Sequence, residues 1–330
     1  MKQKLSISVA ICVWLAAPAA GEHRLYLGAH TSKGWVVGAK LRPSGLFERL
    51  KTGWALVGYP HPAVMTLDYD PRDPRVLYIA AGNGCIRSAD GGRTWTFLTG
   101  WDFTELRDVK VDRHSPDTVW IALPDGVAVS RDRGGAWTRV DLGVARRYTQ
   151  TLAVDREAAG RVLAGTDSGV LLTEDGGATW RSAAPHLRVT THLQQSPHNG
   201  NDWIATTESS GAYSSCDGGR TWSRIPGIPA GTLYNVSFDP TTRGRVAIAG
   251  WAAGVVVSED GGQTWEERQS GMPGREIWRA VFDPDQPGRM YASVHEEAVF
   301  VSDDAGRNWR NAGLEGSLVT DFVFVPGGRQ

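Results

Sequence analysis

A motif of eight residues that returns six times constrains this chain more than any other feature. The copies read SADGGRTW (88–95), SRDRGGAW (130–137), TEDGGATW (173–180), SCDGGRTW (215–222), SEDGGQTW (258–265) and SDDAGRNW (302–309). Their final tryptophans follow one another at steps of 42, 43, 42, 43 and 44 residues. A period near forty residues is typical of propellers and other repeat arrays. The chain is therefore predicted to be a repeat protein.

The repeat at 233–274 indicates what one unit looks like. LYNVSFDP alternates apolar and polar residues, VAIAG and VVVSED are short apolar runs, and TWEERQ follows the glycine turn of the motif. Four strands of about five residues, joined by short turns, require about forty residues. We therefore predict that each repeat is a four-stranded antiparallel blade and that the fold is an all-β propeller.

The two ends of the chain complete the count of blades. The segment 318–326 matches the first strand of the other repeats, whereas 24–29 and 35–41 match a second and a third strand. Trp54 precedes Trp95 by 41 residues and is in phase, although RPSGLFERLKTG replaces the rest of its motif. Pairing the terminal strands in one blade would remove two exposed edges. We predict a closed ring of seven blades; six blades with separately packed ends is the alternative.

Residues 1–21 are predicted to be a signal peptide, and residues 22–330 a single propeller domain. A basic start is followed by a short apolar run and by Ala17-Pro18-Ala19, which indicates cleavage after Ala19, with Gly21 as a second choice. Processing as a lipoprotein at Cys12 is the alternative. We therefore expect a periplasmic or secreted protein. The net charge of −1 argues against a nucleic-acid partner.

The motif resembles the Asp-box, or BNR repeat, of sialidases, sortilin-type receptors, xyloglucan-cleaving glycosidases and photosystem II assembly factors. Six copies in one seven-bladed ring resemble the assembly-factor family most. The resemblance implies a scaffold that binds a protein or peptide and helps to assemble or stabilise a larger envelope complex. Each copy of the motif is called a box below.

The boxes themselves are predicted to be structural. Asp and Ser side chains can accept hydrogen bonds from the backbone of a turn, glycine adopts positive φ there, and a tryptophan ring can be buried between blades. Catalysis would not require six copies around a ring. The residues assigned to this structural role are Asp90, Trp95, Asp132, Trp137, Asp175, Trp180, Asp217, Trp222, Asp260, Trp265, Asp304 and Trp309.

Binding is expected where the repeats differ from one another. One position of the first strands is polar in every repeat, and the position before it includes two aromatic residues; the loops that link blades add further aromatic residues and arginines. The predicted binding residues at the channel mouth are Trp101, Arg107, Asp108, Arg147, Tyr148, His192, Tyr234, Trp278, Arg279 and Asp321, with Arg275 beside them. Arg, Trp and Tyr suit recognition of a peptide, a carboxylate or a sugar. A polar channel wall without a ligand is the alternative.

The sequence favours a monomer without catalysis, metal or cofactor. No Cys-x-x-Cys or His-x-x-x-His motif occurs. The arginine motif of sialidases is absent near the N-terminus, and the adjacent acids Glu296 and Glu297 are those of a solvated loop. The alternative is a glycoside hydrolase or a carbohydrate-binding module. In that hydrolase Asp108 and Asp321 would act as the pair of carboxylates.

Overall fold

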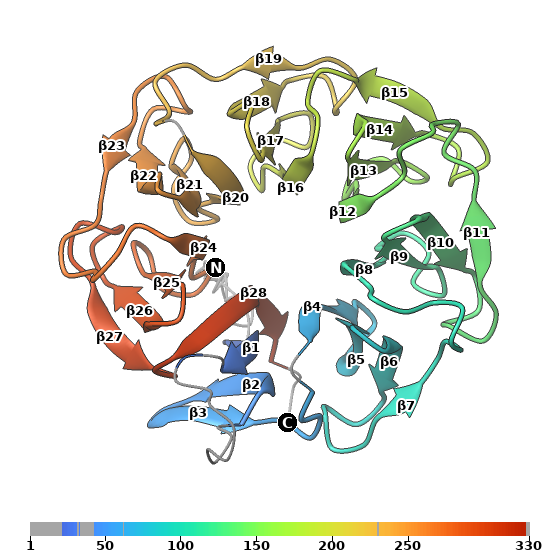
Figure 1. Cartoon of the computed structure of the whole chain (residues 1–330), viewed down its shortest axis with the longest axis horizontal. Coiled ribbons are helices and arrows are strands. Elements are labelled where there is room, and N and C mark those ends of the chain that lie inside the picture. The colour runs from blue at the N-terminus through green and yellow to red at the C-terminus, as the bar shows by residue number, and fades with distance from the viewer. Residues whose placement is uncertain (1–21, 32, 34–42, 62, 230, 328–330) are drawn as a thin grey trace, which may run out of the picture.

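The chain forms a ring of seven four-stranded antiparallel sheets around a central channel (Figure 1). The structure is a computed structural model that describes residues 22–31, 33, 43–61, 63–229 and 231–327. All of its regular structure within these ranges is strand, so the predicted seven-bladed, all-β propeller is confirmed. No helix among these residues is long and apolar enough to cross a membrane.

Each blade runs from an innermost first strand to an outermost fourth strand. The first strands are β4 (Val64–Asp70), β8 (Asp108–Val111), β12 (Thr149–Val154), β16 (Thr190–Gln195), β20 (Thr232–Phe238), β24 (Ile277–Phe282) and β28 (Ser317–Pro326). The second strands are β5 (Asp73–Ala81), β9 (Val119–Leu123), β13 (Val162–Thr166), β17 (Trp203–Thr207), β21 (Val246–Trp251), β25 (Met290–Val294) and β1 (His23–Thr31).

The outer two strands of each blade follow in the same order. The third strands are β6 (Gly84–Ser88), β10 (Gly126–Ser130), β14 (Gly169–Thr173), β18 (Ala212–Ser215), β22 (Gly254–Ser258), β26 (Ala298–Ser302) and β2 (Gly45–Leu50). The fourth strands are β7 (Thr96–Phe97), β11 (Thr138–Val140), β15 (Arg181–Ala184), β19 (Ser223–Arg224), β23 (Glu266–Glu267), β27 (Arg310–Gly313) and β3 (Gly53–Leu56).

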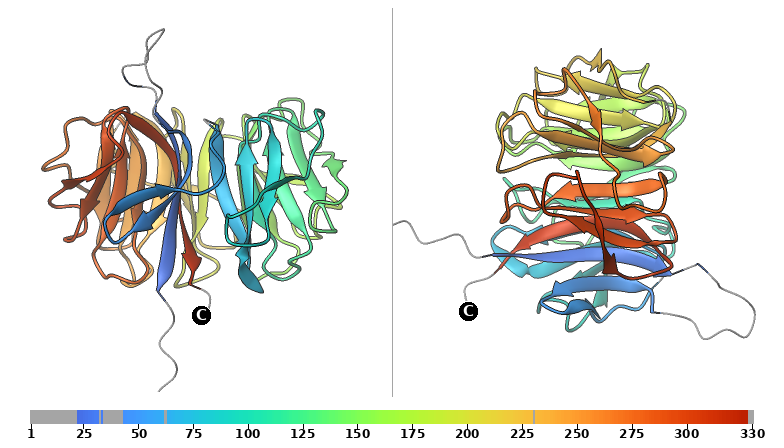
Figure 2. Two further views of the ribbon diagram at one scale, coloured as in Figure 1. Left: turned by 90° about the horizontal axis from the view of Figure 1, so that it is seen from below. Right: turned by 90° about the vertical axis from the view of Figure 1, so that its left-hand side faces the viewer.

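The last blade joins the two ends of the chain, as predicted. Strand β28 pairs with β1 in a register that places Leu27 opposite Phe322, and the two strands lie side by side in Figure 2. The third strand differs from the prediction. Segment 35–41 lies within 34–42, outside the described residues, and the third strand, which pairs with β1, is β2, Gly45–Leu50. A hairpin at Lys51 and Thr52 therefore stands where the other blades have a box.

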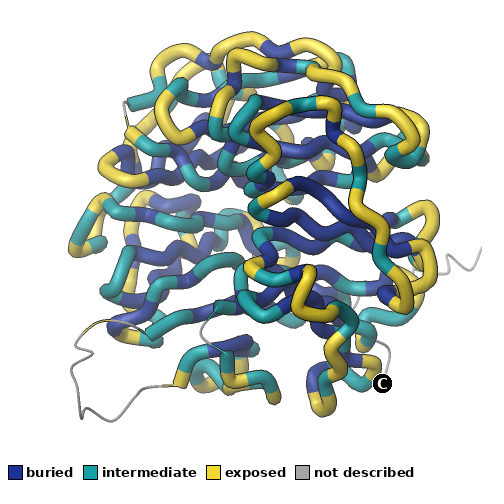
Figure 3. Tube along the Cα trace, turned by 45° about the vertical axis from the view of Figure 1, so that its right-hand side comes forward, coloured by how far each residue is buried: buried dark blue, intermediate teal, exposed yellow. Residues whose placement is uncertain are grey.

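The core consists of the apolar layers between blades. The position of the first strands that the sequence repeats as apolar is buried in all seven blades, at Leu67, Val109, Leu152, Leu193, Val236, Ala280 and Phe322. The second strands are buried along most of their length, whereas the turns and the outer strands are exposed (Figure 3). Seven separate apolar clusters result, and most combine strands of two successive blades.

The box closes the turn between the third and fourth strands by hydrogen bonds. In the blade of β20 to β23, Ser258 ends β22, and its Oγ donates to Asp260 at 2.7 Å and accepts from the backbone N–H of Gly262 at 2.8 Å. The Asp260 carboxylate also accepts from the N–H and the hydroxyl of Thr264. In each of the five other boxes, the Ser or Thr hydroxyl likewise accepts a hydrogen bond from the backbone N–H of the residue four positions later. These bonds are those expected of a turn brace.

Two of the six box tryptophans form hydrogen bonds with a neighbouring blade, whereas Trp222 and Trp265 donate to a glycine carbonyl of their own box. Trp137 and Trp309 donate from Nε1 to the carbonyls of Leu98 and Arg268, both of which belong to the preceding blade. Trp54 does the same to Ala312 at 2.8 Å, although its box has no aspartate. The bond from tryptophan to the preceding blade therefore also occurs where the rest of the motif is lost.

Candidate functional site

The propeller has two faces that differ in their turns. Each box donates one backbone N–H to the turn between the first and second strands, for example Gly261 to Gly244 at 2.8 Å, so these two kinds of turn share what we call the box face. The turns between second and third strands and the loops that link blades form the opposite, link face. The predicted binding residues stand on the link face or in the channel.

The polar position of the first strands has a structural task that the sequence did not suggest. Its side chains accept hydrogen bonds from the backbone of the next blade: Thr66 from Val109, Asp108 from Leu152, His192 from Val236 and Asn235 from Ala280. Asp68, Gln194 and Ser237, two residues further along, make the same kind of bond. At four of the seven equivalent places these side chains therefore form a ladder that ties successive blades together, which agrees with the alternative of a polar channel wall without a ligand.

Four of the predicted binding residues lie near one another in the channel, namely Asp108, His192, Arg279 and Asp321. The carboxylate of Asp108 accepts a hydrogen bond from Lys110 Nζ at 2.8 Å, and Arg279 Nε lies 3.7 Å from Asp321 Oδ1. Burial raises the pKa of Asp321 to about 6, against the opposing effect of Arg279 and Lys110. Burial, with Arg279 and Lys110 nearby, holds the pKa of His192 well below its usual value. The cluster therefore contains a neutral imidazole and a carboxyl that binds a proton more readily than usual.

Burial also governs the cations of this cluster. It lowers the pKa of Arg279, which the carboxylates of Asp321 and Asp108 partly restore. The pKa of Lys110 is raised, because the attraction of Asp108, Asp68 and Asp321 outweighs the effect of burial. The channel thus holds a compact, mutually compensated set of charges.

Four aromatic rings form what we call the aromatic shelf on the link face, between the blades of β20 and β24. Tyr234 and Trp278 stack with centroids 4.3 Å apart and planes 8° from parallel. Trp278 Nε1 bonds to His295 Nδ1 at 2.9 Å, and His295 meets the ring of Trp251 edge to face. Trp251 is 38% exposed. The shelf is joined to the channel cluster, because Arg279 donates to the carbonyl of Tyr234.

The other predicted residues lie apart from the shelf. Arg107 and Tyr148 contact each other through a hydrogen bond and a cation–π contact, beside β8 and β12, across the channel from β24 in Figure 1. Trp101 is 93% exposed on the loop before β8, and Arg147 precedes Tyr148. Among the described residues no contact joins Trp101 or Arg147 to the shelf. Arg275 is held by Glu267 and by the carbonyl of Ala252. The predicted residues thus form two groups rather than one continuous rim.

A cavity at the other end of the channel was not predicted from the sequence. A cavity of about 440 Å³ opens on the box face and is lined by Lys110, Arg113 and Arg156 together with apolar side chains. Lys110 lies on β8, whereas Arg113 and Arg156 lie in the turns after β8 and β12, in segments that differ from repeat to repeat. Only the period of two along β8 could have indicated that Lys110 shares the channel side with Asp108.

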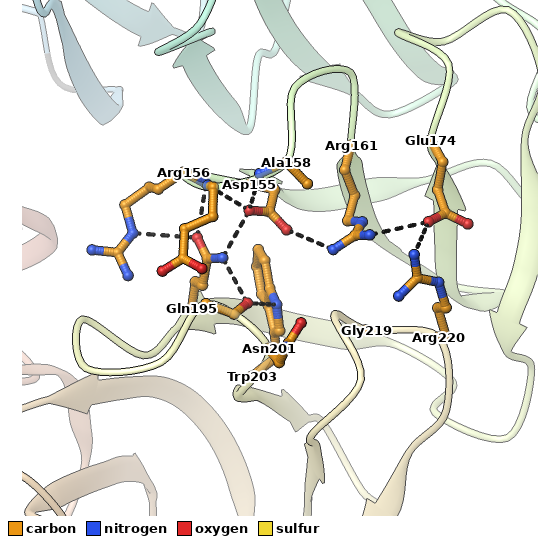
Figure 4. Close-up of polar contacts among 12 residues, drawn as sticks. Asp155, Arg156, Ala158, Arg161, Glu174, Gln195, Asn201, Trp203, Gly219 and Arg220 are labelled. Carbon is orange, nitrogen blue, oxygen red and sulfur yellow. Dashed lines mark hydrogen bonds and ion pairs between the residues drawn. The ribbon is translucent and has the colours of Figure 1, made fainter.

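A network of polar contacts supports this face between the blades of β12 and β16 (Figure 4). Buried Asp155 binds Arg161 and accepts from Gln195 Nε2 at 2.9 Å. Gln195 in turn accepts from Arg156, whereas Arg161 reaches Glu174. The described residues contain no group of three or more His, Cys, Asp or Glu side chains that could hold a metal ion.

Comparisons with known proteins agree on the fold. No protein-family model matches the chain. An oligoxyloglucan-reducing end-specific xyloglucanase of Emericella nidulans is 27% identical over 124 residues, which cover 33% of this chain and 15% of that protein. The chain thus spans a small part of the length of the curated relative that it matches.

Solved structures cover more of the chain. The GH74 enzyme of Niastella koreensis superposes with a TM-score of 0.71 at 18% identity, over 88% of this chain and 54% of the enzyme. YCF48 bound to a D1 peptide superposes with a TM-score of 0.61 at 19% identity, over 77% of this chain and 84% of YCF48. At such identities the likenesses establish the fold alone. They confirm the resemblance to assembly-factor propellers and to xyloglucanase propellers that the boxes indicate.

Proposed function

We propose that this chain is a non-catalytic propeller that binds a protein or peptide partner on its link face. The observation that carries the proposal is the aromatic shelf, in which Trp251 is 38% exposed beside the stacked rings of Tyr234 and Trp278. Trp and Tyr dominate the energetics of protein interfaces because they bury large areas at a small entropic cost. The likeness to YCF48, whose structure was solved with a peptide, supports this kind of partner.

The state of the channel carboxylates supports binding rather than hydrolysis. Asp108 accepts hydrogen bonds from Thr66, Lys110 and the backbone of Leu152, so its oxygens are occupied by the fold itself. A general base needs a lone pair directed at substrate or water. We infer that Asp108 serves the ring and that the partner is held by the aromatic shelf.

The test is affinity capture from an extract of the native cell envelope, with a glycan array in parallel. We expect the wild-type chain to retain a protein, and the double substitution Trp251→Ala with Trp278→Ala to lose it. Arg279 is left intact, because its removal would leave Asp321 unpaired in the channel. Retention of the same protein by the double variant would contradict the proposal.

A matched control comes from the outer edge of the ring. Phe97 on β7 is also a large exposed apolar side chain, at 53%, but it lies far from the shelf in the chain and belongs to another blade. Phe97→Ala should retain the partner as the wild type does. A loss in both variants would indicate nonspecific capture through exposed aromatic rings.

A second candidate function, a glycoside hydrolase of the xyloglucanase kind, is favoured by the curated match and by the likeness to GH74 enzymes. The raised pKa of Asp321 suits a general acid, because a proton-donating carboxyl must keep its proton near neutral pH. Release of reducing ends from xyloglucan, lost in Asp321→Asn, would support this function. No release by the wild-type chain would dismiss it.

We also propose export of the chain by a cleaved signal peptide, with the mature protein in the periplasm or outside the cell and acting as a monomer. Residues 1–21 lie outside the described residues, and the proposal rests on their sequence. Mass spectrometry of the native protein should find an N-terminus at Ala20 or Glu22. A mature chain that begins at Met1 would contradict it.

A further inference from the structure

The cavity at the box face has the size and lining of a small-molecule site. Its volume of about 440 Å³ lies within the usual range of ligand pockets, and Leu193, Phe282 and Phe324 supply apolar walls. It is separated from the aromatic shelf, which stands on the opposite face. A ligand of this cavity would therefore be distinct from the partner of the aromatic shelf.

The charges at this cavity do not cancel. Lys110 is paired with Asp108, and Arg113 is paired with Asp68. Arg156, the third cation of the lining, has no carboxylate within ion-pair distance among the described residues; it binds Gln195 and the carbonyl of Ser196 instead. Burial lowers the pKa of Arg156, against the opposing attraction of Glu157 and Asp155. Arg156 is thus the one arginine or lysine among the described residues of the lining that has no ion-pair partner.

A second polar group can assist at the same place. Gln194 also lines the cavity, and its Oε1 accepts the backbone N–H of Phe238 at 2.8 Å. That bond fixes the side-chain amide and leaves its NH₂ group without a hydrogen-bond partner in the part of the chain that the structure describes. A guanidinium and an amide NH₂ are both donors, and carboxylate oxygens accept from both.

We propose that this cavity binds a small monocarboxylic acid with an apolar body. The carboxylate would face Arg156 and Gln194 at the mouth, and the apolar body would contact Leu193 and the phenylalanines of the wall. A single negative charge matches the one cation without an ion-pair partner in the described lining, and the apolar walls exclude a fully hydrated ion such as inorganic phosphate. The site stands independently of the peptide-binding function proposed above.

Isothermal titration of the purified chain with phenylacetate tests the proposal. Phenylacetate should bind, whereas its neutral analogue phenylacetamide and inorganic phosphate should bind at least tenfold more weakly, because a hydrogen bond to a charged group contributes enough for such a factor. No binding of phenylacetate at millimolar concentration, or equal binding of phenylacetamide, would overturn the proposal.

Three variants locate the site. Arg156→Gln should weaken binding of phenylacetate about tenfold or more, and Ala153→Leu should weaken it by filling the cavity that Ala153 lines. Arg220→Gln is the matched control, because Arg220 is an arginine of the same face that pairs with Glu174 away from the channel (Figure 4). Unchanged binding in a folded Arg156→Gln chain would overturn the assignment. If that variant does not fold, the result for Ala153→Leu decides in the same way.

Discussion

The ladder of side chains between the first strands makes a prediction about stability that separates it from a ligand-binding role. Asn235 on β20 is 2% exposed, and its Oδ1 accepts the backbone N–H of Ala280 on the next blade at 2.9 Å. At the equivalent place four blades earlier in the chain, the hydroxyl of Thr66 accepts from Val109 at 3.1 Å. The chain therefore shows that threonine can provide the same acceptor.

The substitutions Asn235→Val and Asn235→Thr exploit this equivalence. Val and Thr have nearly the same shape, so the two variants differ mainly in the hydroxyl that can accept from Ala280. Ala280 is completely buried, and a buried N–H without a partner costs about 1–3 kcal/mol. We expect Asn235→Val to be less stable than Asn235→Thr by this amount.

The assay is equilibrium unfolding in urea, followed by tryptophan fluorescence and by circular dichroism. The midpoint should fall in the valine variant with little change in the slope, since the surface exposed on unfolding stays the same. A parallel thermal scan should show a decrease of several degrees. Equal stability of the two variants would refute the role of the polar column as a tie between blades.

Three further predictions concern the hydrogen bonds of the box, the buried carboxyl of Asp321 in the channel, and the closure of the ring by β28. Ser258→Ala should destabilise the chain by about 1–3 kcal/mol in urea unfolding, because the N–H of Gly262 loses its acceptor, whereas Ser258→Thr should have a much smaller effect, as Thr173 fills this place in another box. Burial raises the pKa of Asp321 from 3.8 to about 6, so the stabilising contribution of this carboxyl is full below about pH 4 and is lost as the pH rises through 6. Asparagine does not titrate in this range. In unfolding curves measured from pH 4 to above pH 6, the free energy of unfolding of Asp321→Asn should therefore rise relative to that of wild type by on the order of 2–3 kcal/mol. Deleting 317–330 removes β28, which leaves the edge of β1 unpaired, and should give aggregation in light scattering; a stable monomer would contradict the closed ring.

The architecture followed from the sequence because it rests on local signals that recur. Six boxes set the period, and the buried column from Leu67 to Phe322 set the register of the first strands in all seven blades. The prediction was wrong only where the motif is lost. Without a box between Gly45 and Leu56, the sequence offered no marker for the third strand, and the apolar run at 35–41 was the more obvious choice.

The site was less accessible to sequence reasoning, because the relevant contacts cross blades. Alignment of the repeats brought Asp108, His192, Arg279 and Asp321 to one level of the channel, but it could not show that Asp108 and His192 accept bonds from the next blade. Of the aromatic shelf, Tyr234 and Trp278 were predicted. Trp251 and His295 were not, because they lie at the turns between second and third strands, whose direction no repeat specifies. The cavity on the box face depends on residues that vary between repeats and was missed.

Hydroxyl-radical footprinting of the chain, alone and with the protein captured from the envelope, tests the central claim most directly. If the partner binds on the link face, the oxidation of Trp251 and Trp278 should decrease in the complex. The oxidation of Trp265, in a box on the opposite face, should stay unchanged and serves as an internal reference. Protection of Trp265 with no change at Trp251 and Trp278 would contradict the account and move the binding surface to the box face.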